Sequence, residues 1–254
     1  MWTPWKRHFE MQAQRPFPVF AEARPLHPEA HAELLRSLAV FQKGETGEGR
    51  IAHEIDHVVL PGIDDDYRAA LKLFVREEGR HARILGDLLR AHGAPLLETT
   101  WTDRLFVTGR RALGVRVKLL VLLAAEVIGM SFYTLIASHL DARAEKDALN
   151  QISVDETHHL AFHSAFFRAQ CTTWWRRLAF LTAWWLVGSA ACAVVLLDHR
   201  KTVRALNVRM LDVVKTMVAA LRKAQVSSSD SSKGLRSPNM RRRSRAAARE
   251  TSTA

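Results

Sequence analysis

Two Glu-x-x-His motifs constrain the fold of this chain more than any other feature. The first runs from Glu78 to His81 and the second from Glu156 to His159. Residues three apart on a helix are surface neighbours, so each motif offers a carboxylate and an imidazole to the same point. A lone glutamate on an apolar helical stripe precedes each motif. Four helices carrying Glu, Glu-x-x-His, Glu and Glu-x-x-His are the ligand set with which a four-helix bundle holds two metal ions.

The composition agrees with an all-α fold. Hydrophobic residues make up 48% of the 254-residue chain, charged residues make up 25%, and no alternating strand-like run stands out. Such a chain can build one good core with extensions. Cys171 and Cys192 lack the spacing of a disulfide framework, which favours a reducing, cytoplasmic compartment. The first residues contain no apolar stretch, so we expect no cleavable signal peptide.

The periodicity of apolar residues divides the chain into four parts. Residues 1–27 contain several prolines and no clear period, so we expect an irregular arm. Residues 28–172 should form the four-helix bundle, and residues 173–224 an apolar helix followed by an amphipathic basic helix. Residues 225–254 are rich in serine and arginine with few bulky apolar side chains, which predicts a disordered basic tail.

Caps and turn residues mark the ends of the four bundle helices. We expect one helix from Pro28 to Pro61, one from Asp64 to His92, one over residues 115–141 and one over residues 145–170.

Residues 178–197 form a run of twenty residues without a charge. That length is sufficient to cross a bilayer, and tryptophan and arginine on its flanks suit a membrane interface. A helix packed on the bundle or in a homodimer interface explains the run equally well. The sequence leaves the two interpretations open. Much of the net charge of +11 lies in the arginine-rich tail, so we do not expect a nucleic-acid partner.

The candidate ligands outside the two motifs are single glutamates on inward-facing stripes. Glu45 and Glu48 both lie on the stripe of the first helix, and Glu126 lies inside the apolar third helix. Carboxylates buried without cations repel one another and lose their hydration, which is the main argument for metal. Mixed oxygen and nitrogen ligands favour iron or manganese over thiol-binding metals.

Further polar residues near the motifs are candidates for supporting the ligands. A metal-ligating histidine usually donates its other N–H to a carboxylate. Asp155 should therefore reach His81, and Glu77 should reach His159. Tyr133 shares the face of Glu126 and is placed to hydrogen-bond it. For His163, one turn beyond the second motif, a supporting role and a plain core position both remain open.

A third Glu-x-x-His motif provides an internal comparison. It runs from Glu54 to His57, and both residues fall off the inward stripe of the first helix. We interpret it as a solvated coincidence. One such motif is therefore weak evidence, whereas two motifs on apolar stripes, each with a glutamate about thirty residues before it, are strong evidence.

Over residues 30–170 the pattern resembles the ferritin-like di-iron superfamily, which includes bacterioferritin, rubrerythrin, the ribonucleotide reductase small subunit and demethoxyubiquinone hydroxylase. The resemblance implies two irons held by Glu78, His81, Glu126, Glu156 and His159. The stretch from Gly44 to Ile51 is similar to the first helix of the demethoxyubiquinone hydroxylases, which favours Glu45 over Glu48 as its ligand. Ala52 stands where those enzymes often have tyrosine, and the C-terminal helices are unlike theirs. The substrate is therefore not transferable.

The sequence thus predicts an O2-dependent di-iron or iron–manganese oxidoreductase that acts on a small apolar substrate and takes electrons from a partner protein. We expect no catalytic side chains beyond the metal ligands. The alternative is a non-enzymatic iron-storage or peroxide-scavenging protein. A cage of many subunits fits poorly with the bulky apolar helix and the basic tail.

Overall fold

The structure is a computed structural model that describes residues 1–20, 25–46, 49–101, 114–141 and 143–229. The described residues form helices and no strand, which confirms the all-α prediction. The elements are α1 (Thr3–Gln12), α2 (His31–Glu45), α3 (Gly49–Glu54), the 3-10 turn η1 (Ile55–His57), α4 (Asp65–Ala91), α6 (Val115–Ser138), α7 (Arg143–Gln170), α8 (Trp174–Ala205) and α9 (Met210–Ser229).

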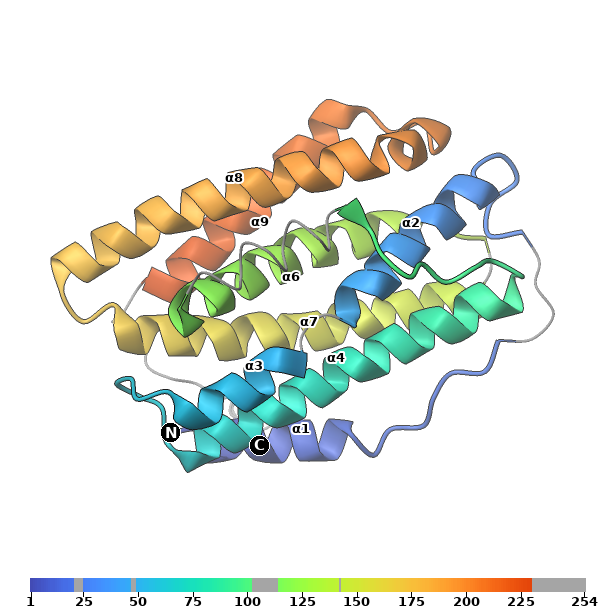
Figure 1. The fold of residues 1–254 in the computed structure, drawn as a ribbon. Coiled ribbons are helices and arrows are strands. Elements are labelled where there is room, and N and C mark those ends of the chain that lie inside the picture. Colours follow the sequence, from blue (N-terminus) through green and yellow to red (C-terminus); the bar gives the residue numbers. More distant parts are fainter. Residues whose placement is uncertain (21–24, 47–48, 102–113, 142, 230–254) are drawn as a thin grey trace, which may run out of the picture.

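The long helices lie side by side with their axes roughly aligned (Figure 1). α2 packs on α4, α6 packs on α7, and α4 meets α7 through the side chains of the two motifs. α8 and α9 form a further layer that packs on α6, with α8 also touching α2 and α9 also touching α7. The four segments that carry the candidate ligands therefore face a shared interior.

α4 shows how local sequence sets the ends of an element. The Asp64 carboxylate accepts a hydrogen bond from the backbone N–H of Tyr67 at 2.8 Å, and Asp65 and Asp66 occupy the first turn. These acidic groups satisfy free N–H groups and complement the positive end of the helix dipole. Gly93 follows the last turn with φ of +64°, a backbone conformation that glycine adopts without strain. The local sequence therefore accounts for both ends of α4.

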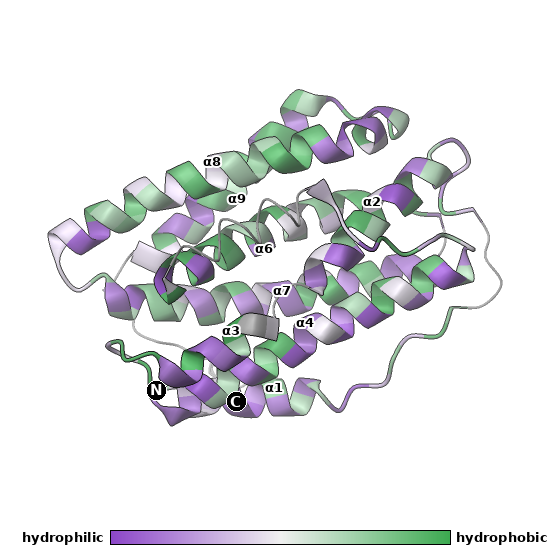
Figure 2. Ribbon diagram, in the orientation of Figure 1, coloured by the Kyte–Doolittle hydropathy of each residue, from purple (hydrophilic) through white to green (hydrophobic). Residues whose placement is uncertain are grey.

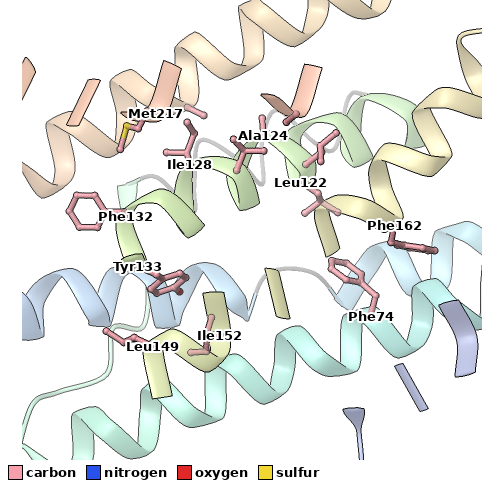
Figure 3. Close-up of a cluster of buried hydrophobic side chains, with 14 of the residues drawn as sticks. Phe74, Leu122, Ala124, Ile128, Phe132, Tyr133, Leu149, Ile152, Phe162 and Met217 are labelled. Carbon is pink, nitrogen blue, oxygen red and sulfur yellow. The ribbon is translucent and has the colours of Figure 1, made fainter. Parts of the chain in front are cut away.

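The described helices share one apolar core, part of which Figure 3 shows in close-up. Phe74 of α4, Ile128 of α6 and Phe162 of α7 are all fully buried. Met217 of α9 is also fully buried and belongs to the same core. The C-terminal helices therefore share one core with the motif-bearing helices.

The N-terminal arm is helical over part of its length, so the prediction of an irregular segment over residues 1–27 is wrong for α1. Pro4 lies in the first turn of α1, where its missing N–H has no intrahelical partner to lose. Trp2 packs its ring edge-on against Tyr67, with centroids 4.8 Å apart, and donates from Nε1 to the carbonyl of Gly62. Burial of aromatic side chains against α4 and α7 stabilises an arm whose prolines suggested irregular structure.

The first predicted bundle helix is divided. α2 ends at Glu45, and the helix resumes as α3 at Gly49. Glycine disfavours a helix interior by about 1 kcal/mol per residue, and three glycines occupy positions 44–49. Glu48, the alternative ligand, lies outside the described residues. The predicted helices at residues 115–141 and 145–170 are present as α6 and α7, with shifted ends.

The uncharged run 178–197 lies inside α8, and α9 carries the amphipathic pattern. Asn207, in the left-handed conformation with φ of 54°, lies in the turn between them. α9 continues to Ser229, so the predicted disorder from residue 225 is wrong for the last turn of this helix. Ser228 is buried and donates a hydrogen bond to Ser164 on α7, which holds the end of α9 to the core. Residues 230–254 lie outside the described residues.

Candidate metal centre

The two Glu-x-x-His motifs meet inside the molecule. Glu78 and His81 come from α4, and Glu156 and His159 come from α7. All four side chains are buried, and one ligand atom from each lies within 4.8 Å of the others. The predicted pairing of the two motifs is therefore present, and these four residues can hold a metal ion.

The separations within this cluster match those between ligands of one ion. His159 Nδ1 lies 2.9 Å from Glu78 Oε1 and 3.2 Å from Glu156 Oε2. His81 Nδ1 lies 3.2 Å from Glu156 Oε1. Adjacent ligands at about 2.1 Å from a central ion in octahedral geometry are roughly 3 Å apart. Glu156 contacts both imidazoles, each with a different oxygen.

Each imidazole is oriented by a carboxylate on the opposite motif. His81 Nε2 lies 3.3 Å from Asp155 Oδ2, and His159 Nε2 lies 3.0 Å from Glu77 Oε2. These are the two contacts expected from the sequence. A carboxylate beside Nε2 holds a proton on that nitrogen, which leaves Nδ1 as the nitrogen available to an ion.

Arg15 joins the two supporting carboxylates, and sequence reasoning missed it. Its Nη2 lies 2.7 Å from Asp155 Oδ2 and 3.0 Å from Glu77 Oε1. Both carboxylates are nearly inaccessible to solvent, so they need a counter-charge. In the sequence, only the need of Glu77 and Asp155 for a counter-charge indicates that such a cation exists. Nothing indicates that it is Arg15, because Arg15 lies in the arm for which periodicity predicts no regular structure.

The lone glutamates occupy the other side of the centre. Tyr133 donates a hydrogen bond to Glu45 Oε1 at 2.6 Å, so the prediction that it bonds Glu126 is wrong. Tyr133 and Glu45 face each other across the α2–α6 contact, whereas Tyr133 and Glu126 point from different turns of one helix. Glu126 lies instead beside His163, with Oε1 3.3 Å from Nε2, but the two groups are not aligned for a hydrogen bond.

The carboxylates influence one another's ionisation. Burial, followed by the nearby charge of Glu78, raises the pKa of Glu45 well above its ordinary value. Burial and Glu156 raise the pKa of Glu126 in the same way. Burial also opposes the charge on Glu156, but the imidazoles of His159 and His81 outweigh it and hold its pKa at about 2. Several carboxylates therefore share a space that lacks enough positive charge for all of them.

Several atoms at the centre lack hydrogen-bond partners among the described residues. They are Glu78 Oε1, His81 Nδ1 and both carboxylate oxygens of Glu126. Buried polar atoms are nearly always satisfied in native proteins, so a concentration of unsatisfied acceptors around one point is unusual. Divalent cations satisfy such acceptors and neutralise the carboxylates at once. The donor set therefore fits a metal centre.

A cavity of about 170 Å³ adjoins the centre. Glu45, Glu78, Glu126 and Glu156 line one side of it together with Tyr133. The remaining wall is mostly apolar and includes residues from α2, α6 and α8. Glu45 and Glu126 are thus placed beside the four-residue cluster and on the same cavity. A small apolar molecule in this cavity would lie against the candidate ligands.

Comparisons with models of protein families, with curated proteins and with solved structures found no match for this chain. The arrangement of its own residues is therefore the basis for any functional conclusion.

Proposed function

We propose that this protein is a ferritin-like O2-dependent oxidoreductase with two iron ions, or one iron and one manganese ion, acting on a small organic substrate. The observation that carries the proposal is the buried cluster of Glu78, His81, Glu156 and His159 with unsatisfied acceptors, open to an apolar cavity. Glu45 and Glu126 complete the ligand set. Oxygen and nitrogen donors with negative charge suit iron and manganese.

The chain contributes binding, orientation and exclusion of water. When bound, such a metal pair supplies the reduction of O2 and the oxidising power that acts on a substrate. Asp155 and Glu77 hold the imidazoles with Nδ1 toward the centre, and Arg15 holds those two carboxylates in place. The Tyr133 hydroxyl fixes the orientation of Glu45. The apolar wall keeps bulk water away from the reacting groups. The reducing equivalents come from a separate electron-donor protein.

Metal analysis tests the site directly. We expect iron or manganese in the purified wild-type protein and its loss in Glu78→Ala and Glu156→Ala. Glu54→Ala is the matched control, because Glu54 belongs to a Glu-x-x-His motif but pairs with Lys118 away from the centre. Equal metal content in all four proteins would refute the site assignment.

Iron storage and peroxide scavenging are the alternatives. An apolar cavity against the candidate ligands favours chemistry on an organic molecule over passage of hydrated iron. Size-exclusion chromatography distinguishes storage, since a closed shell of many subunits would overturn the oxidoreductase proposal. Consumption of O2 by iron-loaded protein with a chemical reductant, without a preference for peroxide, supports it.

The outer face of α8 favours association with a membrane surface. Among the described residues, α6 and α8 are long and apolar enough to span a membrane, and only 22% of the most apolar window of α8 is buried, against 56% for α6. Leu178, Leu186 and Leu197 are exposed, and no charged residue lies between the first and the last of them. The middle of α8 is largely hydrophobic (Figure 2). Its inner face packs on α6 and α9, so this helix is held to the core.

We propose that this outer face rests on an anionic lipid surface, and that the protein is cytoplasmic and peripherally attached. Exposed Trp174 and Trp175 lie at one end of the face, and Arg200 and Lys201 at the other, as suits an interfacial helix. Flotation with vesicles containing phosphatidylserine tests this proposal. We expect binding that falls in Leu186→Glu. A wild-type protein that stays unbound and elutes as a homodimer would show instead that a second copy covers the face.

A further inference from the structure

Two polar residues of α8 line the cavity beside the candidate metal centre, in addition to the glutamates. Asp198 and His199 line it on the side formed by this helix. The Asp198 side chain is 13% exposed, and its Oδ2 is buried without a hydrogen-bond partner among the described residues. Arg36 reaches the other oxygen, Oδ1, only at 3.8 Å. Oδ2 is therefore an acceptor without a donor.

A chain of hydroxyl groups fixes the hydrogen positions on His199. Thr202 donates its hydrogen to the carbonyl of Glu33 at 2.8 Å, so Thr202 accepts from Ser37 at 2.6 Å. The Ser37 hydroxyl has then used its hydrogen, and it accepts from His199 Nδ1 at 2.7 Å. Burial, followed by the charge of Arg36, lowers the pKa of His199 to about 3, so the ring is neutral at pH 7. Its Nε2 is consequently a second hydrogen-bond acceptor.

The other residues that line the cavity favour a small apolar ligand. Phe41 stacks on His199 with centroids 4.7 Å apart and an interplanar angle of 11°, and Leu122, Ile128 and Val195 line the same space. The cavity volume is about 170 Å³. A dry apolar cavity of about 150 Å³ is large enough to bind benzene. The cavity therefore accommodates a body of about one six-membered ring.

We propose that this cavity binds a single-ring aromatic compound of the phenol or aniline class. The hydroxyl or amino hydrogen of the compound is donated to the Asp198 carboxylate, with His199 Nε2 as the neighbouring acceptor, and the ring extends between apolar side chains toward Glu126 and Glu156. The identification as a binding site stands on the cavity alone, whereas the role of the compound as substrate rests on the proposed oxidoreductase function.

Phenol and anisole are the probes, because they share a ring and nearly a shape, but anisole has no hydrogen to donate. Isothermal titration calorimetry is carried out on the full-length protein as purified and again after chelation, with metal content measured on the same samples. We expect phenol to bind about tenfold or more tightly than anisole, as one hydrogen bond to a charged acceptor provides. Asp198→Asn should reduce this preference to about twofold.

Two substitutions at Gly129 test whether the cavity is the binding site. A Cβ built at Gly129 meets only Phe41, at 3.9 Å, so Gly129→Ala should fold normally and Gly129→Leu should extend into the cavity. We expect phenol affinity to fall several-fold in the alanine variant and to be lost in the leucine variant. Thermal unfolding confirms that each variant is folded, and the alanine variant suffices if the leucine variant does not fold.

The outcomes separate the two proposals. Equal affinity for phenol and anisole, or phenol binding unchanged by Asp198→Asn and Gly129→Ala, would overturn the inference. Phenol binding by a wild-type protein that contains neither iron nor manganese as purified, and takes up neither when they are supplied, would overturn the proposed function and leave the binding site in place. Metal binding with no affinity for phenol would overturn the binding-site inference and leave the proposed function in place.

Discussion

The two sides of the candidate metal centre differ in how the protein holds its ligands. On the α4–α7 side each imidazole contacts a carboxylate behind it, and Arg15 ties those carboxylates together. On the α2–α6 side Glu45 is held by Tyr133, and Glu126 has no aligned hydrogen-bond partner among the described residues.

The histidines show the same difference. Carboxylates around His81 and His159 outweigh their burial and raise the pKa of both imidazoles. His163 is also on α7 but lies beside Glu126 of α6, and burial, followed by the charge of His159, lowers its pKa to about 3. The α4–α7 side is thus organised by compensating charges, whereas Glu126 on the α2–α6 side has no aligned partner among the described residues. We therefore expect the first pair of helices to set the position of the site and the second pair to adjust to a bound ion.

Removal of a ligand should show the largest effect and should be unequal between the two sides. We expect Glu156→Ala to abolish binding of both ions, since Glu156 contacts both imidazoles. Glu126→Ala should retain at least one ion, because the four-residue cluster stays intact. Metal-to-protein ratios measured after dialysis check this. Complete loss in both variants would show that the two sides form a single cooperative unit.

Arg15→Met should have the next largest effect, on stability. It leaves Glu77 and Asp155 buried without their shared cation, and breaking a buried pair costs about 3–5 kcal/mol. Since the Arg15 side chain is 26% exposed, we expect a loss nearer to 2 kcal/mol. Urea unfolding of metal-free protein measures it. Arg83→Met is the control, because Arg83 is largely exposed, and it should change the free energy of unfolding by less than about 0.5 kcal/mol.

The pH dependence of stability should reveal that His199, on the cavity wall, is neutral in the folded protein. The pKa of His199 is about 3 in the folded protein and about 6.5 in the unfolded chain, so the unfolded state gains a proton first as pH falls. The contribution of neutral His199 to the free energy of unfolding is present in full above about pH 6.5 and is lost as pH falls toward 3. Between pH 6 and 4 we expect wild type to lose on the order of 1 kcal/mol per pH unit more than His199→Gln. Parallel pH dependence in the two proteins would contradict the assignment of a neutral ring.

Tyr133→Phe should have the smallest effect of the four. It removes the hydroxyl that holds Glu45, and a hydrogen bond of this kind contributes about 1 kcal/mol. We expect that loss in metal-free protein and a smaller one in metal-loaded protein, where an ion orients the carboxylate. Thermal unfolding with and without added manganese measures the difference. An equal loss in both states would show that Glu45 does not contact the ion.

The sequence alone determined the all-α fold, the main helices after residue 64 and the four residues that converge on the centre. Each depends on helical geometry within one element: Glu78 and His81 are three residues apart, as are Glu156 and His159, and residues at that spacing share a face. The sequence also predicted the contacts of Asp155 with His81 and of Glu77 with His159, because each carboxylate directly precedes one motif and faces the other.

Only the tertiary structure decided which helices contribute the remaining contacts. Helical periodicity gives the face on which Tyr133 lies but not the neighbour opposite it, and the packing of α2 on α6 places Glu45 there. Arg15 reaches the centre because aromatic burial folds α1 onto α4. Asp198 and His199 meet the cavity only because α8 packs on α6 and α2. These contacts join residues far apart in the chain, and their free energy comes from burial, which a local pattern does not encode.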